Sequence, residues 1–319
     1  MIKAIAITGP TASGKTALSI ELATRLGAQI ISCDSMQIYR GMDIGTAKAT
    51  AEERAAVPHC MIDFLPPTEP YSAESYRKAA MLEAERIVGE GSLPMFVGGT
   101  GLYIDTVMRG CEVATPESDP EYREKILADI SSEEDRQRLW ERLREVDPES
   151  AEKTHYNNIK RVIRALEIYD ATGISKSVFD RESRGAASDV SVKMITLDFH
   201  DRELLYKRVD KRVDIMMREG LYDEVLSLYE AGLLRDDTTA AQAIGYKEIV
   251  SAIRGECSLD EAVEEIKLSS RRYAKRQLTW FRHKGEAIRI FADTEDGRRR
   301  DLKDICDEAE KIVREFLEN

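Results

Sequence analysis

The sequence predicts an α/β fold: a parallel sheet covered by helices, with an all-helical insertion domain. Three observations support this prediction. A short apolar run at residues 2–7 precedes a glycine-rich turn and then a helical pattern. Further short apolar runs alternate with helical segments, as they do in parallel sheets that are covered on both faces. A long, charged helical stretch separates the last apolar run from the others.

We expect the strands at residues 2–7, 29–32, 95–97 and 192–199, because each is a short apolar run beside turn residues. Helical patterns follow the first run, through Leu18, Leu22 and Leu26, and precede the third at residues 76–88. The predicted division is a first part of the core at 1–114, the helical insertion at 115–187 and a second part of the core at 188–319. The C-terminal part is again expected to be helical.

Composition excludes several classes of protein. The chain has 319 residues, enough for one α/β core carrying an insertion. No apolar run approaches the ~18 residues that a membrane span needs, so we expect no membrane partner. Five cysteines and four histidines show no zinc-site spacing. We expect reduced thiols, a cytoplasmic location and a monomer. The net charge of −12 argues against nucleic-acid binding by the surface as a whole.

The segment GPTASGKT at residues 9–16 matches the pattern G-x-x-x-x-G-K-[ST] in full. Its glycines let backbone N–H groups point at phosphate oxygens, and the following helix adds the positive end of its dipole. Lys15 supplies a positive charge, and the Thr16 hydroxyl is suited to bind Mg²⁺. We therefore expect a P-loop NTPase-like core. The expected phosphate-binding residues are Gly9, Pro10, Thr11, Ala12, Ser13, Gly14, Lys15 and Thr16.

Two acids could serve this phosphate site, because the carboxyl ends of neighbouring parallel strands converge on the ligand crevice. Asp34 follows one predicted strand and Asp198 another. Asp198 is equally suited to cap a helix. Asp34 opens the dense polar segment DSMQIYRGMDIGTAK, which is neither periodic nor turn-like. This segment is better explained by recognition of an acceptor than by burial, and Asp34 is also a candidate Mg²⁺ ligand.

Residues 266–285 contain seven Lys or Arg and no acid. On a helix, Lys267, Arg271, Lys275 and Arg282 fall within about 80° of one another. Ile266, Tyr273 and Trp280 fall on the opposite side, so we expect that side to contact the core and the basic side to face a polyanion. A second basic cluster, Lys160, Arg161 and Arg164, lies on the polar side of another predicted helix.

Five segments together resemble the tRNA dimethylallyltransferase (tRNA isopentenyltransferase) family: GPTASGKT, DSMQIYRGMDIGTAK, VGGTGLYI, KRVIRALEIY and KRQLTWFR. The resemblance runs from about residue 2 to residue 284. It implies transfer of the dimethylallyl group from dimethylallyl diphosphate to N6 of the adenosine just 3′ of a tRNA anticodon. The P-loop would then hold diphosphate as a leaving group, with Mg²⁺, rather than a nucleotide.

The resemblance also implies roles for individual residues. Asp34 matches the family's catalytic base, and Thr100 in GGTG matches a residue near the acceptor base; Lys15 and Thr16 would assist the leaving group. Gln37 could hydrogen-bond an adenine that has left its stack. Together with the basic side above, the expected tRNA-contacting residues are Asp34, Ser35, Met36, Gln37, Thr100, Arg123, Lys160, Arg161, Val162, Ile163, Arg164, Arg271, Lys275, Arg276, Gln277, Trp280 and Arg282.

Other functions stay open at this point. A small-molecule kinase would use the P-loop with Asp34 as base, and an RNA-dependent NTPase would use Asp198 for Mg²⁺ and water. A non-catalytic tRNA-binding module would not need Asp34. A prenyltransferase of free adenine nucleotides would not need the basic helices.

Overall fold

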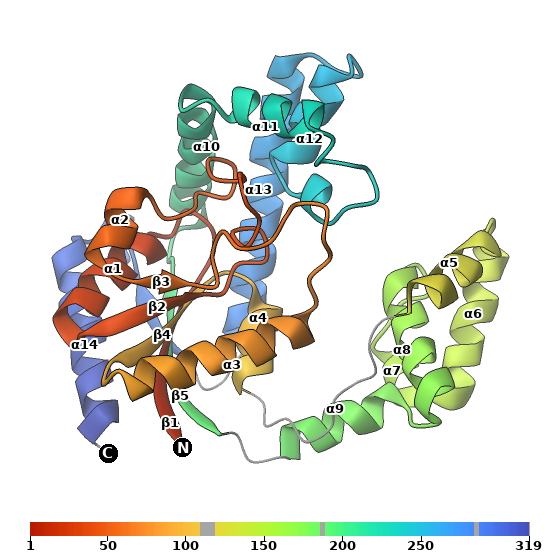
Figure 1. Cartoon of the computed structure of the whole chain (residues 1–319), viewed down its shortest axis with the longest axis horizontal. Helices are drawn as coiled ribbons and strands as arrows, with labels where there is room; N and C mark the ends of the chain where they lie inside the picture. The colour runs from red at the N-terminus through yellow and green to blue at the C-terminus, as the bar shows by residue number, and fades with distance from the viewer. Residues whose placement is uncertain (109–118, 186–188, 284–286, 319) are drawn as a thin grey trace. The chain divides into compact units, whose positions relative to one another are not determined.

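The computed structural model describes residues 1–108, 119–185, 189–283 and 287–318 (Figure 1). The chain divides into two compact units, one of Met1–Met108 with Val190–Asn319 and the other of Arg109–Asp189. The boundaries expected near 114 and 187 fall outside the described residues, so their positions stay predictions.

In the described part of the first unit, six strands form one parallel sheet in the order β3-β2-β4-β1-β5-β6. The strands are β1 (Ile2–Thr8), β2 (Ala28–Ser32), β3 (His59–Cys60), β4 (Leu93–Gly98), β5 (Val190–Asp198) and β6 (Ile288–Phe291). The parallel sheet confirms the predicted fold class, and four strands lie where the apolar runs predict them.

Helices connect these strands and continue beyond them. In the first unit they are α1 (Lys15–Leu26), α2 (Ala51–Ala56), α3 (Ala73–Gly89), α4 (Gly101–Met108), α10 (Arg202–Arg218), α11 (Leu221–Glu230), the 3₁₀ turn η1 (Ala240–Gln242), α12 (Tyr246–Ile253), α13 (Leu259–Arg282) and α14 (Leu302–Glu318). In the second unit they are α5 (Pro120–Ala128), α6 (Glu133–Val146), α7 (Pro148–Glu152), α8 (Ile159–Thr172) and α9 (Lys176–Gly185).

Side-chain alternation along β1 divides the core of the first unit between the two faces of the sheet. Ile5 and Ile7 lie in one apolar cluster with residues of α1, α10 and α14. Ala4 and Ala6 lie in a second cluster, with residues of α3 and α4. The central strands are thus buried on both sides, which explains why they read as continuous apolar runs.

A third apolar cluster joins α10–α13 to the loop that follows β2. It includes Tyr39 of that loop, Val213 of α10 and Ile266 of α13, all almost completely buried. Figure 1 shows α10 rising from the end of β5, with α13 beside it. This cluster stands beyond the carboxyl ends of the strands and forms the wall against which the polar segment after β2 folds.

That polar segment is held by the Glu224 carboxylate and by the ion pairs of Lys48. The Glu224 carboxylate accepts backbone N–H bonds from Asp43, Ile44 and Gly45 at 2.9, 2.7 and 3.1 Å. It also accepts the Tyr246 hydroxyl at 2.6 Å. The buried Lys48 ammonium lies 2.5 Å from an Asp43 oxygen and 2.7 Å from an Asp63 oxygen. Much of the polarity in DSMQIYRGMDIGTAK is therefore used to fix its own backbone.

Two features of the first unit differ from expectation. The C-terminal part is not wholly helical, because Ile288–Phe291 forms β6 beside β5. This four-residue run is short and mixed with arginine, so its apolar pattern alone is weak. Residues His59–Cys60 add the short edge strand β3 beside β2. None of the helices in the described ranges is long and apolar enough to cross a membrane.

Glu224→Gln should lower the free energy of unfolding by about 1–3 kcal/mol, because a carboxamide presents N–H donors where the loop needs acceptors. Urea denaturation followed by circular dichroism measures this change. Glu230→Gln, an exposed substitution in the same helix, is the matched control and should stay within about 0.5 kcal/mol of the wild type. Equal stability of the two variants would contradict a role for Glu224 in holding the loop.

Candidate active site

The P-loop leaves β1 through a turn that only glycine fits. Gly9 has φ 141°, and a Cβ there would lie 2.8 Å from the Leu197 carbonyl oxygen. Helix α1 begins at Lys15 behind Gly14, with no side-chain cap and no acid in its first turn. The first N–H groups of a helix have no acceptor within the helix, so this end is suited to bind an anion.

Two cations face the cavity beside this loop. The Lys15 ammonium donates to the Pro10 carbonyl at 2.7 Å. Burial lowers the pKa of Lys15 to about 7, with the Arg212 guanidinium adding to the effect and the Asp34 carboxylate opposing it. Burial also lowers the pKa of Arg212, again opposed by Asp34. Two partly buried cations near one carboxylate leave an excess of positive charge, which a bound anion would neutralise.

Asp34 presents one oxygen to the same cavity. Its Oδ1 accepts the backbone N–H groups of Met36 at 2.9 Å and Gln37 at 3.4 Å, which closes a turn directly after β2. Among the described residues, no hydrogen-bond donor to Oδ2 is present. The carboxylate is thereby held at the start of the turn with one oxygen available to accept a proton.

Thr100 holds the segment that carries Asp34. Its backbone N–H donates to the Cys33 carbonyl at 3.1 Å, and its hydroxyl accepts the Ser35 N–H at 3.1 Å. The same hydroxyl donates to the Ser35 hydroxyl at 3.4 Å. The GGTG turn after β4 and the DSMQ turn after β2 are therefore joined on both sides of Asp34.

The two glutamine side chains expected to contact tRNA both hydrogen-bond within the chain. Gln277 Oε1 accepts the Thr11 N–H at 2.8 Å, and its Nε2 donates to the Gly99 carbonyl at 2.9 Å. A Cβ on Gly99 would lie 2.2 Å from Nε2, so only glycine allows this approach. Gln37 accepts from the Ser32 hydroxyl and donates to the carbonyls of Thr46 and Ala47. In this structure both amides connect neighbouring backbone segments, and the expectation that Gln37 contacts an extruded base stays a prediction.

These groups line one cavity of about 360 Å³. Of the predicted site residues, it brings together Thr11, Lys15, Thr16, Asp34, Ser35, Met36, Gln37, Arg276 and Gln277. Gly9, Pro10, Ala12, Ser13 and Gly14 shape the loop without lining the cavity, and Thr100 acts through Ser35. The buried Ser13 hydroxyl has no partner among the described residues. The remaining wall comes from the loop after β2, the end of β4, α10, α11, the loop before α12, and α13, and its α10 and α11 part is mostly apolar.

The basic side expected on α13 is mostly neutralised, which corrects the sequence-based orientation. Lys267 pairs with Asp214 at 2.9 Å and Arg271 with Asp210 at 2.6 Å. Arg282 binds the completely buried Asp198 with two hydrogen bonds, at 2.7 and 3.0 Å. The acids of α10 and β5 lie far away in sequence, so a count of charges along α13 could not reveal them.

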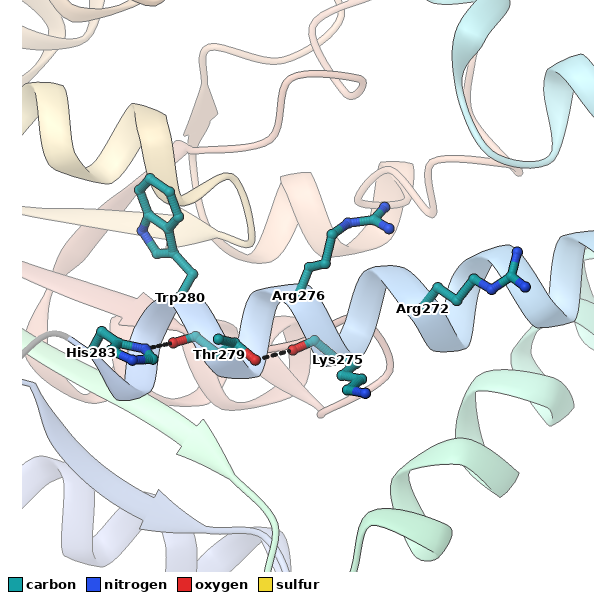
Figure 2. A pocket seen from close by; sticks show the side chains of 6 residues that line it. All are labelled: Arg272, Lys275, Arg276, Thr279, Trp280 and His283. Atoms are coloured by element: carbon teal, nitrogen blue, oxygen red, sulfur yellow. Dashed lines mark hydrogen bonds between the residues drawn. The ribbon is translucent and has the colours of Figure 1, made fainter. Parts of the chain in front are cut away.

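The side of α13 opposite to these ion pairs is only partly buried. Ile266 lies in the core and Tyr273 lines the cavity, but Trp280 is 37% exposed. Figure 2 shows Arg272, Arg276 and Trp280 projecting from one side of α13 and Lys275 from the other. With Thr279 and His283 they line a surface pocket. Arg276 lines both this pocket and the cavity, so it stands where the two meet.

In the second unit the predicted tRNA residues divide by burial. Lys160 and Arg161 are exposed in the first turn of α8, whereas the side chains of Val162 and Ile163 are buried in this unit. Arg123 and Arg164 both bind the buried Glu167 carboxylate, at 2.8 and 2.5 Å. Burial raises the pKa of Glu167, but the two guanidinium groups outweigh it and hold that pKa below its usual range. The side chains at 162 and 163 pack within this unit, so the expectation that these two residues contact tRNA stays a prediction.

Among the cavity residues that the sequence did not predict as part of the site, Arg212 and Tyr273 bear most directly on its chemistry. Arg212 lies on α10 with Val209, Val213 and Met216, which recur at helical spacing. A single Arg within this apolar side of a helix was the only feature of the sequence that could have indicated its role. Tyr273 was expected only to contact the core. Burial, followed by the Asp34 carboxylate, raises the pKa of its phenol to about 12, so it remains a proton donor beside Asp34.

Comparison with known proteins agrees with this site. A sequence model of the family described as IPP transferase matches residues 37–284, and one described as isopentenyl transferase matches residues 2–63. A tRNA dimethylallyltransferase of Geobacillus thermodenitrificans is 47% identical over 282 residues, 88% of each chain. The chain belongs to the tRNA dimethylallyltransferase family. The resemblance predicted from the five segments is confirmed.

Solved structures extend this similarity to the fold. A full-length tRNA isopentenylpyrophosphate transferase of Bacillus halodurans matches with a TM-score of 0.73 at 41% identity, covering 100% of this chain and 97% of that one. A eukaryotic dimethylallyltransferase acting on tRNA matches with a TM-score of 0.77 at 30% identity, covering 91% and 74%. The P-loop-like sheet is thus the architecture of the tRNA dimethylallyltransferase family.

Inorganic diphosphate should bind with uptake of a proton above pH 7. The lowered pKa leaves Lys15 largely neutral at pH 8, and an adjacent anion favours its charged form. Calorimetric titration in two buffers of different ionisation enthalpy measures the number of protons taken up per diphosphate bound, because the buffer supplies them. Lys15→Arg is the matched control, because arginine is always charged. The wild type should take up about one proton more per site than the variant; equal uptake would contradict the assignment.

Proposed function

We propose that this chain transfers the dimethylallyl group from dimethylallyl diphosphate to N6 of the adenosine 3′-adjacent to the anticodon of tRNA and releases diphosphate. The observation that carries the proposal is the single cavity, in which excess positive charge, one carboxylate and an apolar wall meet. The proposal extends to a monomer acting in the cytoplasm, where unmodified tRNA is available.

The leaving group is stabilised at the P-loop. As the allylic C–O bond breaks, negative charge grows on diphosphate, and Lys15, Arg212 and the N–H groups at the start of α1 are fixed beside it. Preorganised donors of this kind are worth about 2.7–4 kcal/mol each in transition-state stabilisation. The buried site strengthens them further because water is excluded.

The acceptor is activated by Asp34. Adenine N6 is a weak nucleophile, so its proton must leave as the N6–C1 bond forms, and Asp34 Oδ2 accepts it. Thr100 and Ser35 keep the carboxylate in place, and the neutral Tyr273 phenol offers a hydrogen bond on the same side of the cavity. The five-carbon group lies against the apolar wall, where it is shielded from water.

Thr16 is the residue that would hold Mg²⁺ together with diphosphate oxygens; Asp34, the other ligand predicted from the sequence, is assigned here to proton transfer. Within the described ranges no group of three or more His, Cys, Asp or Glu could bind a metal by itself. This donor set fits Mg²⁺, which keeps several waters and is commonly held by one or two protein groups together with substrate phosphates. When bound, the ion would neutralise charge developing on diphosphate.

The tRNA is held by residues whose charges remain available. On α13 these are Arg272, Lys275 and Arg276, with Trp280 as a stacking surface. In the second unit they are Lys160 and Arg161. Arg271, Arg282, Arg123 and Arg164 act instead through the carboxylates of their own chain.

Hydrolysis of a nucleotide is the less favoured function. Asp198, the acid it would need, is fully buried, is bound by Arg282 and does not line the cavity. We therefore expect negligible ATP consumption with or without tRNA. The decisive assay is incubation with dimethylallyl diphosphate, Mg²⁺ and unmodified tRNA, followed by mass analysis of the nucleosides. Release of phosphate from ATP without modified adenosine would contradict the proposal.

Asp34→Asn should lower the rate of transfer by about 10²–10⁴-fold, the usual contribution of a general base, while tRNA affinity stays close to that of the wild type. Single-turnover mass analysis and filter binding measure the two quantities. Asp223→Asn, an exposed substitution in α11, controls for loss of a negative charge and should leave both unchanged. A parallel loss of tRNA affinity in Asp34→Asn would assign Asp34 to binding instead.

Lys275→Ala should weaken tRNA binding and reduce the slope of log affinity against log salt by about one, because one phosphate contact is lost. Arg271→Ala is the paired control: it leaves Asp210 without its cation and should lower stability with little change in slope. Salt titration of tRNA affinity distinguishes them. If the Arg271 variant loses as much slope as the Lys275 variant, the assignment of the two residues is wrong.

A further inference from the structure

The positions of residues along helix α10 show how far each part of the cavity lies from the P-loop. Val209, Arg212, Val213 and Met216 line it at spacings of three and four, so they share one face of the helix. Arg208, one residue before this series, donates to the Ala12 carbonyl at 2.8 Å, which fixes that part of α10 at the P-loop. With a rise of about 1.5 Å per residue, Met216 lies about 6 Å beyond Arg212, away from the P-loop.

Helix α13 runs beside α10 in the opposite direction. Arg271 pairs with Asp210, and Lys267, one turn earlier, pairs with Asp214, one turn later. Gln277 binds the P-loop at Thr11, so residues with lower numbers on α13 lie progressively farther from the loop. Ile266, which also lines the cavity, is therefore level with the Met216 end of α10.

The cavity thus has two chemically different ends. The P-loop end carries Lys15 and Arg212. The far end is lined by side chains of one buried apolar cluster: Val213, Met216, Leu221, Ala243 and Ile266. Leu221 and Ile266 are 0% and 2% exposed, and Met216 is 8% exposed. These side chains are buried, so a tail that extends from the P-loop end would meet them directly.

We infer that Met216 and Ile266 form the end wall that limits the donor to a five-carbon prenyl chain. The inference rests on the proposed function, which fixes the diphosphate at Lys15 and Arg212 with its tail toward the far end. The distance of about 6 Å along α10 accommodates a short branched tail. A second isoprene unit would have to displace both side chains, and overpacking a buried apolar wall costs about 1–3 kcal/mol or more.

Met216 is the side chain best suited to set this limit. Methionine is unbranched and fills irregular gaps, so its truncation to alanine removes three heavy atoms along the direction of the tail. Ile266 forms the wall from α13 and supplies an independent test. The chemistry with a ten-carbon donor is unchanged: the C1–O bond breaks with its electron pair leaving on diphosphate, the N6–C1 bond forms and the N6 proton passes to Asp34.

The test compares dimethylallyl diphosphate with geranyl diphosphate as donors to unmodified tRNA, using kcat/KM from mass analysis of the nucleosides. The wild type should use the five-carbon donor and reject the ten-carbon one. In Met216→Ala and in Ile266→Ala, the preference for the five-carbon donor should fall at least tenfold, since one methylene in an apolar pocket is worth about 10–200-fold. Inhibition of the normal reaction by geranyl diphosphate should strengthen in parallel.

Val209→Ala is the matched control, because it enlarges the same helix face at the P-loop end and should leave the preference unchanged. An unchanged preference in both wall variants, with normal tRNA affinity as proof of folding, would overturn the inference and leave the proposed function intact. An equal change in Val209→Ala would also overturn it. A wild type that modifies tRNA with neither donor would overturn the proposed function, and the inference with it.

Discussion

The rest of this structure depends on two mutually repelling cations, Lys15 and Arg212, held near one carboxylate in the cavity. Lys15 comes from the P-loop and Arg212 from α10, and Asp34 only partly offsets their charge. Bringing like charges together out of water is unfavourable, so the arrangement is stable only because the surrounding core holds it. A bound anion that carries several charges would relieve this repulsion, which is the basis for the proposal that diphosphate binds here.

The surrounding polar groups keep these charges in position. Gln277 connects Thr11 of the P-loop to Gly99 after β4, and Thr100 connects the same turn to Ser35 beside Asp34. The P-loop and the segment that carries Asp34 are thus connected by hydrogen bonds through the residues that follow β1, β2 and β4. Gln277 and Arg276 are adjacent on α13. The same helix therefore lines the surface pocket through Arg276 and binds the P-loop through Gln277.

Intramolecular ion pairs restrict where RNA can bind. On α10, Asp210 pairs with Arg271 and Asp214 with Lys267. In the second unit, the Glu167 carboxylate pairs with both Arg123 and Arg164. Among the described residues, Arg272, Lys275 and Arg276 on α13 and Lys160 and Arg161 on α8 keep charges that no ion pair neutralises. On a chain with net charge −12, such local positive charge favours a polyanion there over binding by the surface as a whole.

The sequence alone determined the sheet, the P-loop and the family, because apolar runs and local spacing are properties of neighbouring residues. Lys15 was recognisable from the P-loop pattern, whereas the expected roles of Asp34 and Thr100 came from the resemblance of their segments to the family. Tertiary structure decided which polar groups are free. Gln37 and Gln277 hydrogen-bond to backbone groups, and Arg282 pairs with a buried aspartate. Arg212 lines the cavity from α10, a helix whose sequence showed no functional motif. Partners distant in sequence make these differences, and no local pattern records them.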